Sequence, residues 1–273
     1  MPTATISGPD RAAPGRGFGF ARQIRLIGAG LLVPLLGLVV WTVGARAGWV
    51  PPQILPAPDV VWDTALDLWQ SGDLFANALI SLQRVILGFA AGATLGLLLG
   101  TAMGLSKPFE AYAHVLFTGL AQVPALGWIP LVMLLVGIGE PLKLIIIAVG
   151  TLVPVAWNTR AGIRAVPLGW FEAASLWRYS RAQVVWYIVL PAAVPQIFVG
   201  LRYGLGHAWL ALVVVELLAS SEGLGYLLVW GRQMFQLDVV IATMAVIGVI
   251  GFTLDAALAA IERRLQRWQV ADQ

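Results

Sequence analysis

Residues 85–106 read VILGFAAGATLGLLLGTAMGLS and hold no charged residue between Arg84 and Lys107. A helix needs about 20 predominantly apolar residues to cross the hydrocarbon core of a bilayer. A glycine recurs at every fourth position of this stretch, namely at Gly88, Gly92, Gly96, Gly100 and Gly104. Small residues at this spacing let helix backbones approach closely in lipid. The stretch therefore predicts a membrane-spanning helix with a glycine stripe that packs against neighbouring helices.

The composition of the whole chain also indicates a membrane protein. Of its 273 residues, 59% are hydrophobic and 11% are charged, whereas soluble domains carry about 25% charged residues. The 12 Trp and 30 Gly are typical of membrane helices and their interfaces. No Cys is present, which excludes disulfides and thiolate metal sites. The net charge of +3 is too small to indicate a nucleic-acid partner.

Further uncharged runs predict further spans. We expect an all-α polytopic membrane protein with about six transmembrane helices, near residues 26–45, 85–105, 111–137, 142–159, 191–216 and 237–258. The third contains Pro124 and Pro130, so it is either kinked or a helix followed by a broken segment. An alternative for the first run is a cleaved signal peptide, although its apolar core is longer than the usual length of about 7–15 residues.

The placement of Lys and Arg predicts that both termini are cytoplasmic, because cytoplasmic segments carry the excess of these residues. With this orientation, twelve of them lie in inner segments and four in outer segments. The inner residues are Arg11, Arg16, Arg22, Arg25, Lys107, Arg160, Arg164, Arg178, Arg181, Arg263, Arg264 and Arg267. The outer residues are Arg46, Arg84, Lys143 and Arg232.

The chain divides accordingly into four segments. They are a disordered cytoplasmic tail (1–20), a first transmembrane helix with an outer, periplasmic segment (21–83), a core transmembrane domain (84–262) with a cytoplasmic loop at 160–190, and a cytoplasmic tail (263–273). In the outer segment, Asp59, Asp63 and Asp67 recur every fourth residue and predict an amphipathic helix. That helix either lies on the outer membrane surface or contacts an external partner.

The cytoplasmic loop leads into the stretch EAASLWRYSRAQVVWYIVLPAAVP, residues 172–195. We expect a short helix over 171–178 and a second over about 180–189. The residue before a proline is pushed out of helical geometry, so a corner is expected at Leu190-Pro191. Two short helices ending at a corner are typical of an element that docks against a cytoplasmic partner.

This stretch carries a resemblance to a known family. Glu172-Ala173-Ala174, Ile188, Leu190 and Pro191 match the spacing EAA-x3-G-x9-I-x-L-P of membrane subunits of ATP-binding-cassette (ABC) importers. One position departs, because Arg178 stands where the family has a glycine that permits a tight turn. The segments 123–143, 158–174 and 200–228 resemble the nitrate/sulfonate/taurine branch of these permeases, and aliphatic-sulfonate permeases most closely. The similarity covers roughly residues 50–268.

The resemblance implies a type I ABC importer permease fold and a non-enzymatic pore subunit in the bacterial inner membrane. The residues that couple to the ATPase would be Glu172, Ala173, Ala174, Arg178, Ile188, Leu190 and Pro191. The implied partners are two cytoplasmic ATPase subunits that carry ATP and Mg, a second permease copy, and a periplasmic or lipid-anchored substrate-binding protein. No cofactor is expected on this chain. The implied substrate is an aliphatic sulfonate, with taurine, nitrate and bicarbonate as alternatives.

Polar residues inside the fifth span are the candidates for the translocation pathway, because charged residues in a span usually face a pathway or a buried partner. They are Arg202, His207 and Glu216. Arg202 and Glu216 are separated by about 21 Å of helix, so they do not pair with each other. For Arg202 a buried tie to another helix remains the alternative.

Two further alternatives stay open at this point. Glu172 is either a contact to the ATPase or a helix N-terminal acid favoured by the macrodipole. A secondary transporter driven by an ion gradient, or a membrane scaffold, would also fit the composition, but neither explains the docking stretch. The sequence contains none of the patterns G-x-x-x-x-G-K-[ST], H-E-x-x-H and G-x-S-x-G, so we expect no catalytic residue and no metal site.

Overall fold

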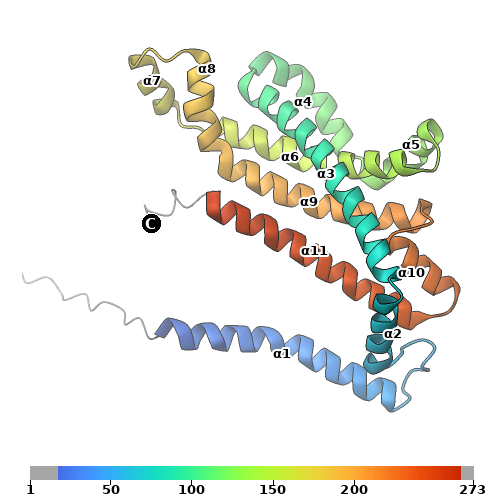
Figure 1. Ribbon diagram of the computed structural model, residues 1–273. Coiled ribbons are helices and arrows are strands. Elements are labelled where there is room, and N and C mark those ends of the chain that lie inside the picture. Colours follow the sequence, from blue (N-terminus) through green and yellow to red (C-terminus); the bar gives the residue numbers. More distant parts are fainter. Residues whose placement is uncertain (1–17, 266–273) are drawn as a thin grey trace, which may run out of the picture. The chain divides into compact units, whose positions relative to one another are not determined.

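The computed structural model describes residues 18–265, with side chains from Leu32 onward, and this part of the chain is helical (Figure 1). The two expected tails, 1–20 and 263–273, lie mostly outside the described residues. The chain divides into two units, 1–60 and 61–273. The elements are α1 (Phe18–Arg46), α2 (Pro58–Gln70), α3 (Asp73–Leu105), α4 (Lys107–Ala121), η1 (Ala125–Trp128), α5 (Ile129–Val136), α6 (Glu140–Arg164), α7 (Leu168–Leu176), α8 (Arg181–Val184), the π-helical η2 (Val185–Val189), α9 (Leu190–Ala219), α10 (Leu224–Gln233) and α11 (Leu237–Leu265).

Four helical stretches of the described chain are long and apolar enough to cross a membrane. They are α3, α6, the continuous run Arg181–Ala219, and α11. The third expected span is instead a bent pair, in which α4 and the η1–α5 segment meet at 86°. Pro124 precedes η1 and Pro130 lies at the start of α5, so the expectation of a helix followed by a broken segment is confirmed. In the other unit, α1 is apolar over Leu32–Arg46.

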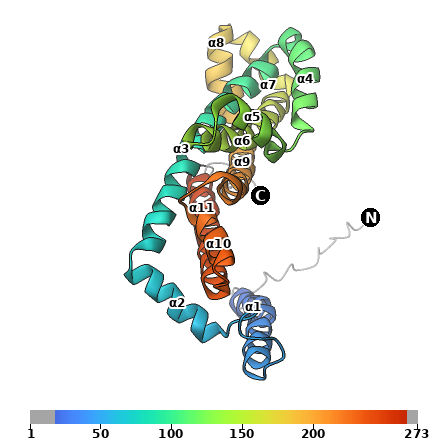
Figure 2. The same cartoon turned by 90° about the vertical axis from the view of Figure 1, so that its right-hand side faces the viewer.

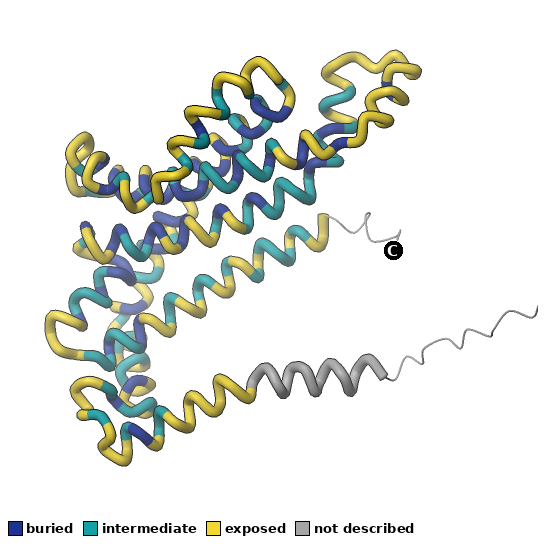
Figure 3. Tube along the Cα trace, turned by 180° about the vertical axis from the view of Figure 1, so that it is seen from behind, coloured by how far each residue is buried: buried dark blue, intermediate teal, exposed yellow. Residues whose placement is uncertain are grey.

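Helix α6 is the centre of the larger unit, and glycines of two neighbours lie against it. All five glycines of the stripe on α3 face α6, since a Cβ added at any of them would meet residues between Leu144 and Ile163. A Cβ at Gly96, for example, would come within 2.9 Å of the Leu152 carbonyl oxygen. On another side of α6, Gly200 and Gly204 of α9 lie against residues between Thr151 and Asn158. Figure 3 shows the resulting concentration of buried residues along α6 and α9.

The stripe meets one helix rather than several. Glycines four residues apart drift by about 40° per step around a helix of 3.6 residues per turn, so contact with more than one neighbour was conceivable. The two helices instead cross so that α6 follows the stripe from Gly88, beside Ile147, to Gly104, beside Ile163. Backbones brought together in this way gain close packing, which drives helix association in lipid.

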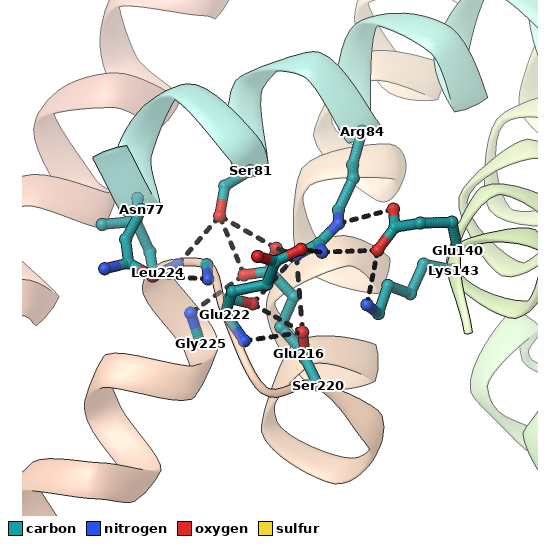
Figure 4. Close-up of polar contacts among 11 residues, drawn as sticks. Asn77, Ser81, Arg84, Glu140, Lys143, Glu216, Ser220, Glu222, Leu224 and Gly225 are labelled. Atoms are coloured by element: carbon teal, nitrogen blue, oxygen red, sulfur yellow. Dashed lines mark hydrogen bonds and ion pairs between the residues drawn. The ribbon is translucent and has the colours of Figure 1, made fainter. Parts of the chain in front are cut away.

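The outer ends of the spans are joined by a buried ionic network around Arg84 of α3 (Figure 4). The side chains of Arg84 and Glu216 are 3% and 0% exposed, and Arg84 Nη1 lies 2.8 Å from Glu216 Oε1. Arg84 Nη2 lies 2.6 Å from Glu140 Oε1 at the start of α6. It also lies 3.0 Å from Glu222 Oε1 in the loop after α9. Lys143 Nζ completes the cluster at 2.7 Å from Glu140.

The same network holds the N-terminus of α10, whose first backbone N–H groups have no partner within the helix. The Gly225 N–H donates to Glu216 Oε2 at 2.9 Å. The Leu224 N–H donates to Ser81 Oγ at 2.9 Å, and the Ser81 hydroxyl is in turn 2.9 Å from the Glu216 carboxylate. Gly223 adopts φ +103°, and a Cβ there would overlap the Glu216 carboxylate. Glu216 thus fixes α3, α9 and α10 together.

We predict that Gly92→Ala weakens the packing of α3 on α6. The added Cβ would overlap the Ala148 carbonyl oxygen and Thr151, and overpacking of this kind costs about 1–3 kcal/mol of unfolding free energy. The matched control is Gly206→Ala on α9, where no heavy atom lies within 4 Å of the added Cβ. Thermal unfolding of both variants in detergent should separate them, and equal melting temperatures would contradict the packing role of the stripe.

We predict a non-additive response of the Arg84–Glu216 pair. Arg84→Met leaves a buried carboxylate without its cation and should lower the unfolding free energy by about 3–5 kcal/mol. Glu216→Gln keeps an acceptor for the Gly225 N–H, so combining it with Arg84→Met should recover much of that loss. A double-mutant cycle of thermal unfolding measures the coupling. Strictly additive effects would show that the two side chains do not stabilise each other.

Candidate functional site

The loop between α6 and α9 projects from the end of the bundle opposite to the Arg84 network (Figure 1). It begins after Arg164 and consists of α7, a tight turn, α8 and η2. Its base is packed, because Ile163 and Val166 form a buried cluster with Val189 and Ala193. Of the two short helices expected from the sequence, the first is present as α7, whereas the second, α8 with η2, is the beginning of the continuous run Arg181–Ala219 rather than a separate helix.

Arg178 makes the turn between α7 and α8 in the conformation that glycine favours. Its φ is +55°, in the left-handed region. The Tyr179 N–H donates to the Ala174 carbonyl at 3.1 Å and the Arg178 N–H to the Ser175 carbonyl at 3.0 Å, which is the Schellman arrangement that ends many helices. A non-glycine residue held in this region costs about 1–2 kcal/mol. The turn of the family pattern is thus preserved at the expense of local strain.

The expected corner at Leu190-Pro191 is wrong. Leu190 has helical dihedral angles, φ −62° and ψ −49°, and the helix runs on from η2 into α9. The chain accommodates Pro191 with a π-helical turn over Val185–Val189, in which the Leu190 N–H donates to the Val185 carbonyl. The wider turn provides the room and the changed hydrogen-bond pattern that a proline requires. The sharp reversal lies earlier, at Arg178.

Three of the motif residues line an open hollow of about 460 Å³. Ala173 and Ala174 of α7 and Ile188 of η2 line it, together with the aromatic side chains of Trp170, Trp177, Tyr179 and Tyr187. Arg178 lies at the tip of the loop, while Leu190 and Pro191 lie below it in α9. Large apolar side chains on this loop are well exposed, with Leu176 at 84% and Trp177 at 80%. Exposed apolar surface of this kind is typical of sites that contact a protein or a membrane.

Glu172 lies on the exposed side of α7. Helix α7 begins at Leu168 and has no acidic residue in its first turn. The helix dipole acts on charges within that first turn, so it does not account for Glu172. Glu172 is thus a surface carboxylate on the same short helix as the exposed Trp170.

The three polar candidates of the fifth span lie in three different surroundings. Arg202 ties α9 to α11, with Nη2 at 3.0 Å from Asp255 Oδ2 and Nη1 at 3.4 Å from Glu262 Oε2. Glu216 belongs to the Arg84 network. His207 lines an apolar cavity of about 680 Å³. The structure therefore does not bring the three residues together.

The cavity beside His207 lies between the broken third span and the central helices. It is bounded by α3, α4, η1, α6 and α9, and its lining is predominantly apolar. His207 Nδ1 lies 2.8 Å from the Tyr203 carbonyl oxygen. A carbonyl oxygen only accepts hydrogen bonds, so a hydrogen bond here requires the tautomer with its proton on Nδ1. Pro154 and Gly150 also line the cavity. Because proline has no N–H, Pro154 cannot donate the usual helical hydrogen bond to the Gly150 carbonyl.

The sequence did not predict two ionic clusters. Arg84 was expected only as an outer charge, although a lone arginine at the edge of an apolar run needs a partner such as the lone Glu216. At the inner end, the Glu110 carboxylate of α4 pairs with both Arg160 and Arg164 of α6. Arg160 also lies over the Trp157 ring, 5.3 Å from its centroid. This second cluster ties the broken span to α6 just before the loop begins.

Comparison with known proteins matches the sequence of this chain to a family. The model of the family described as binding-protein-dependent transport system inner membrane component matches residues 92–267. SsuC of Bacillus subtilis (strain 168), whose name assigns it to aliphatic sulfonate transport, is 39% identical over 240 residues, which cover 88% of this chain and 87% of SsuC. The taurine transport system permease protein TauC of Escherichia coli (strain K12) is 36% identical, with 91% of each chain covered.

Solved structures share the fold. A chain of the MetNI methionine ABC transporter in an inward-facing conformation superposes with a TM-score of 0.61 at 17% identity, covering 70% of this chain and 96% of that one. A chain of an amino acid ABC transporter has the same TM-score at 20% identity and covers 72% of this chain and 96% of its own. The ABC importer permease fold predicted from the sequence is thus confirmed. Together with the family match, these findings show that the chain belongs to the multi-pass inner membrane permease components of binding-protein-dependent transport systems.

Proposed function

We propose that this chain is the pore subunit of an ATP-driven importer for small aliphatic sulfonates. Two copies would form the pathway, two ATPase subunits would dock on the α7–η2 loops, and a substrate-binding protein would deliver the anion to the outer face. The ATPase subunits would bind ATP and Mg. Similarity to SsuC and TauC supports this branch, and the bicarbonate permease CmpB of Synechococcus elongatus (strain ATCC 33912 / PCC 7942 / FACHB-805) is a relative at 30% identity.

The observation that carries the transport function is the α7–η2 loop. It presents exposed apolar side chains and the Glu172 carboxylate at one end of the bundle. It is also joined without a flexible linker to α6 and α9, since three residues separate α6 from α7 and η2 continues into α9. A displacement of the loop by a closing ATPase would therefore move α6 and α9, and so shift the population between inward-open and outward-open packings.

The cavity beside His207 supports an aliphatic substrate over an inorganic anion. Its volume of about 680 Å³ lies within the range of about 300–1,000 Å³ of small-molecule sites. Side chains such as Leu99, Phe117 and Val153 suit an alkyl chain, whereas bicarbonate or nitrate would leave them without a partner. We assign His207 to this part of the pathway. Arg202 and Glu216 would act on transport only through the helices that they hold together.

We predict that Glu172→Lys uncouples ATP hydrolysis from uptake. The side chain is exposed, so insertion and thermal stability should stay unchanged. Reversing a charge at a docking interface costs several kcal/mol, which corresponds to a loss of coupling of more than about tenfold. The measurement is substrate-stimulated ATPase activity and uptake in vesicles that contain the ATPase and the binding protein.

The matched variant for this test is Arg178→Gly in the same loop. It removes the left-handed strain of Arg178 and should leave coupling intact or improve it. Phe235→Gly serves as a control for stability alone, because Phe235 has a similar φ of +57° in the turn between α10 and α11. If Glu172→Lys couples normally, the loop is only a linker, and the transport function rests on the family match.

We predict that Val153→Phe makes uptake depend on the length of the substrate chain. The larger ring would fill part of the cavity, so uptake of an eight-carbon alkanesulfonate should fall by more than about tenfold while ethanesulfonate changes little. Val249→Phe, at an exposed position of α11, is the control. An equal loss for all chain lengths would remove the cavity from the pathway. Failure of the parent transporter to take up any sulfonate would instead refute the proposed substrate.

A further inference from the structure

Residues 61–70 of helix α2 belong to the larger unit and present three distinct faces. One face packs on the protein, with Val61 buried. A second face carries Trp62, Leu66 and Trp69, which are 66%, 40% and 60% exposed. At 3.6 residues per turn, these three side chains fall within an arc of about 60°. The third face carries the exposed carboxylates of Asp63 and Asp67, about 90° further around the helix.

The depth of α2 in the membrane is fixed by its contact with the last span. Thr64 Oγ1 donates to Asp238 Oδ2 at 2.7 Å, and Asp238 lies in the first turn of α11. Gly72, with φ +84°, then turns the chain from α2 into α3, and Figure 2 shows α2 leaving the direction of α3 at a sharp angle. Asp238 directly precedes the uncharged run 239–254 of α11, so its contact with Thr64 places α2 level with the start of an apolar run.

The exposed apolar face of α2 continues onto a face of α3 that faces away from the protein. The rings of Trp69 and Phe75 meet edge to face with centroids 6.1 Å apart. Phe75 shares one side of α3 with Leu79 and Ile86, all three of them more than 40% exposed. Ile86 on this side lies within the uncharged run 85–106 of the span. The exposed apolar surface of α2 therefore continues onto an exposed apolar side of α3.

We propose that α2 is an interfacial anchor, in which Trp62, Leu66 and Trp69 insert into the boundary between headgroups and acyl chains of the outer leaflet while Asp63 and Asp67 remain in water. Tryptophan is enriched at this depth because its ring is apolar and its N–H finds a polar partner. Helices of this type bury their apolar face about 5–10 Å into the boundary. The lipid surface, rather than a protein, is the occupant because the stripe continues through the Trp69–Phe75 contact onto the exposed apolar side of a candidate membrane span.

The anchor gives the outer end of the bundle a fixed position in the membrane. Through the Thr64–Asp238 hydrogen bond and the corner at Gly72, α2 holds the outer ends of α11 and α3. The acidic face points away from the bilayer and stays accessible to an external protein. Contact with lipid and contact with a binding protein would then use different faces of one helix.

Site-directed spin labelling tests this proposal with a matched pair of faces on one helix. The chain contains no Cys, so the variants Trp62→Cys, Leu66→Cys, Asp63→Cys and Asp67→Cys each offer one labelling site. The labelled full-length chain is assembled with its ATPase subunits in vesicles of phosphatidylcholine and phosphatidylglycerol. The ratio of oxygen to nickel-chelate accessibility is then measured by power saturation. We expect a ratio several-fold higher at positions 62 and 66 than at positions 63 and 67.

Two results would overturn the anchor. Equal chelate accessibility at all four positions would show that α2 lies in water, clear of the bilayer. Chelate accessibility at 62 and 66 that disappears only when the binding protein is added would make the stripe a protein-docking surface.

Discussion

The buried ion pair between Arg84 and Glu216 is the constraint on which the arrangement of the outer half depends. A charge inside a membrane protein is costly unless it is paired and hydrogen-bonded, and each oxygen of Glu216 has a donor, from Arg84, Ser81 or Gly225. These donors come from α3 and α10, while Glu216 lies on α9. Glu140 adds the start of α6 to the same guanidinium. Four helices therefore share one electrostatic centre, and none of them moves there without breaking a charge-assisted bond.

The inner half is held by ties of another kind. Glu110 links α4 to α6, and Arg202 links α9 to α11, each across partly exposed side chains. Each of these ties joins only two helices, whereas the Arg84 network joins four. Between the two ends, the glycine contacts keep α3, α6 and α9 at close distance. A closely packed middle, a rigid outer end and a more weakly tied inner end favour movement at the inner end, where the α7–η2 loop is attached.

The sequence predicted features that depend on neighbouring residues and missed those that depend on distant ones. The uncharged run 85–106 and its glycine spacing defined α3 and the side of it that packs, because both signals are periodic along one helix. The two prolines near 124–130 located the broken span. Arg84 and Glu216, by contrast, are 132 residues apart, and nothing local shows that they meet. The prediction of a corner at Leu190-Pro191 was wrong because a single π turn relieves the constraint that proline imposes, and tertiary packing selects that turn.

The separation of Arg202, His207 and Glu216 bears on how an anion would cross. Both charged residues are neutralised by partners within the fold, and no Lys, Arg, Asp or Glu is among the described residues that line the cavity. A passing anion would therefore meet a mostly apolar wall and the His207 ring, without a fixed cation that would trap it. Conduction requires binding weak enough for release. A pore with this lining suits a transport system in which tight recognition of the substrate belongs to a separate binding protein, as the family description implies.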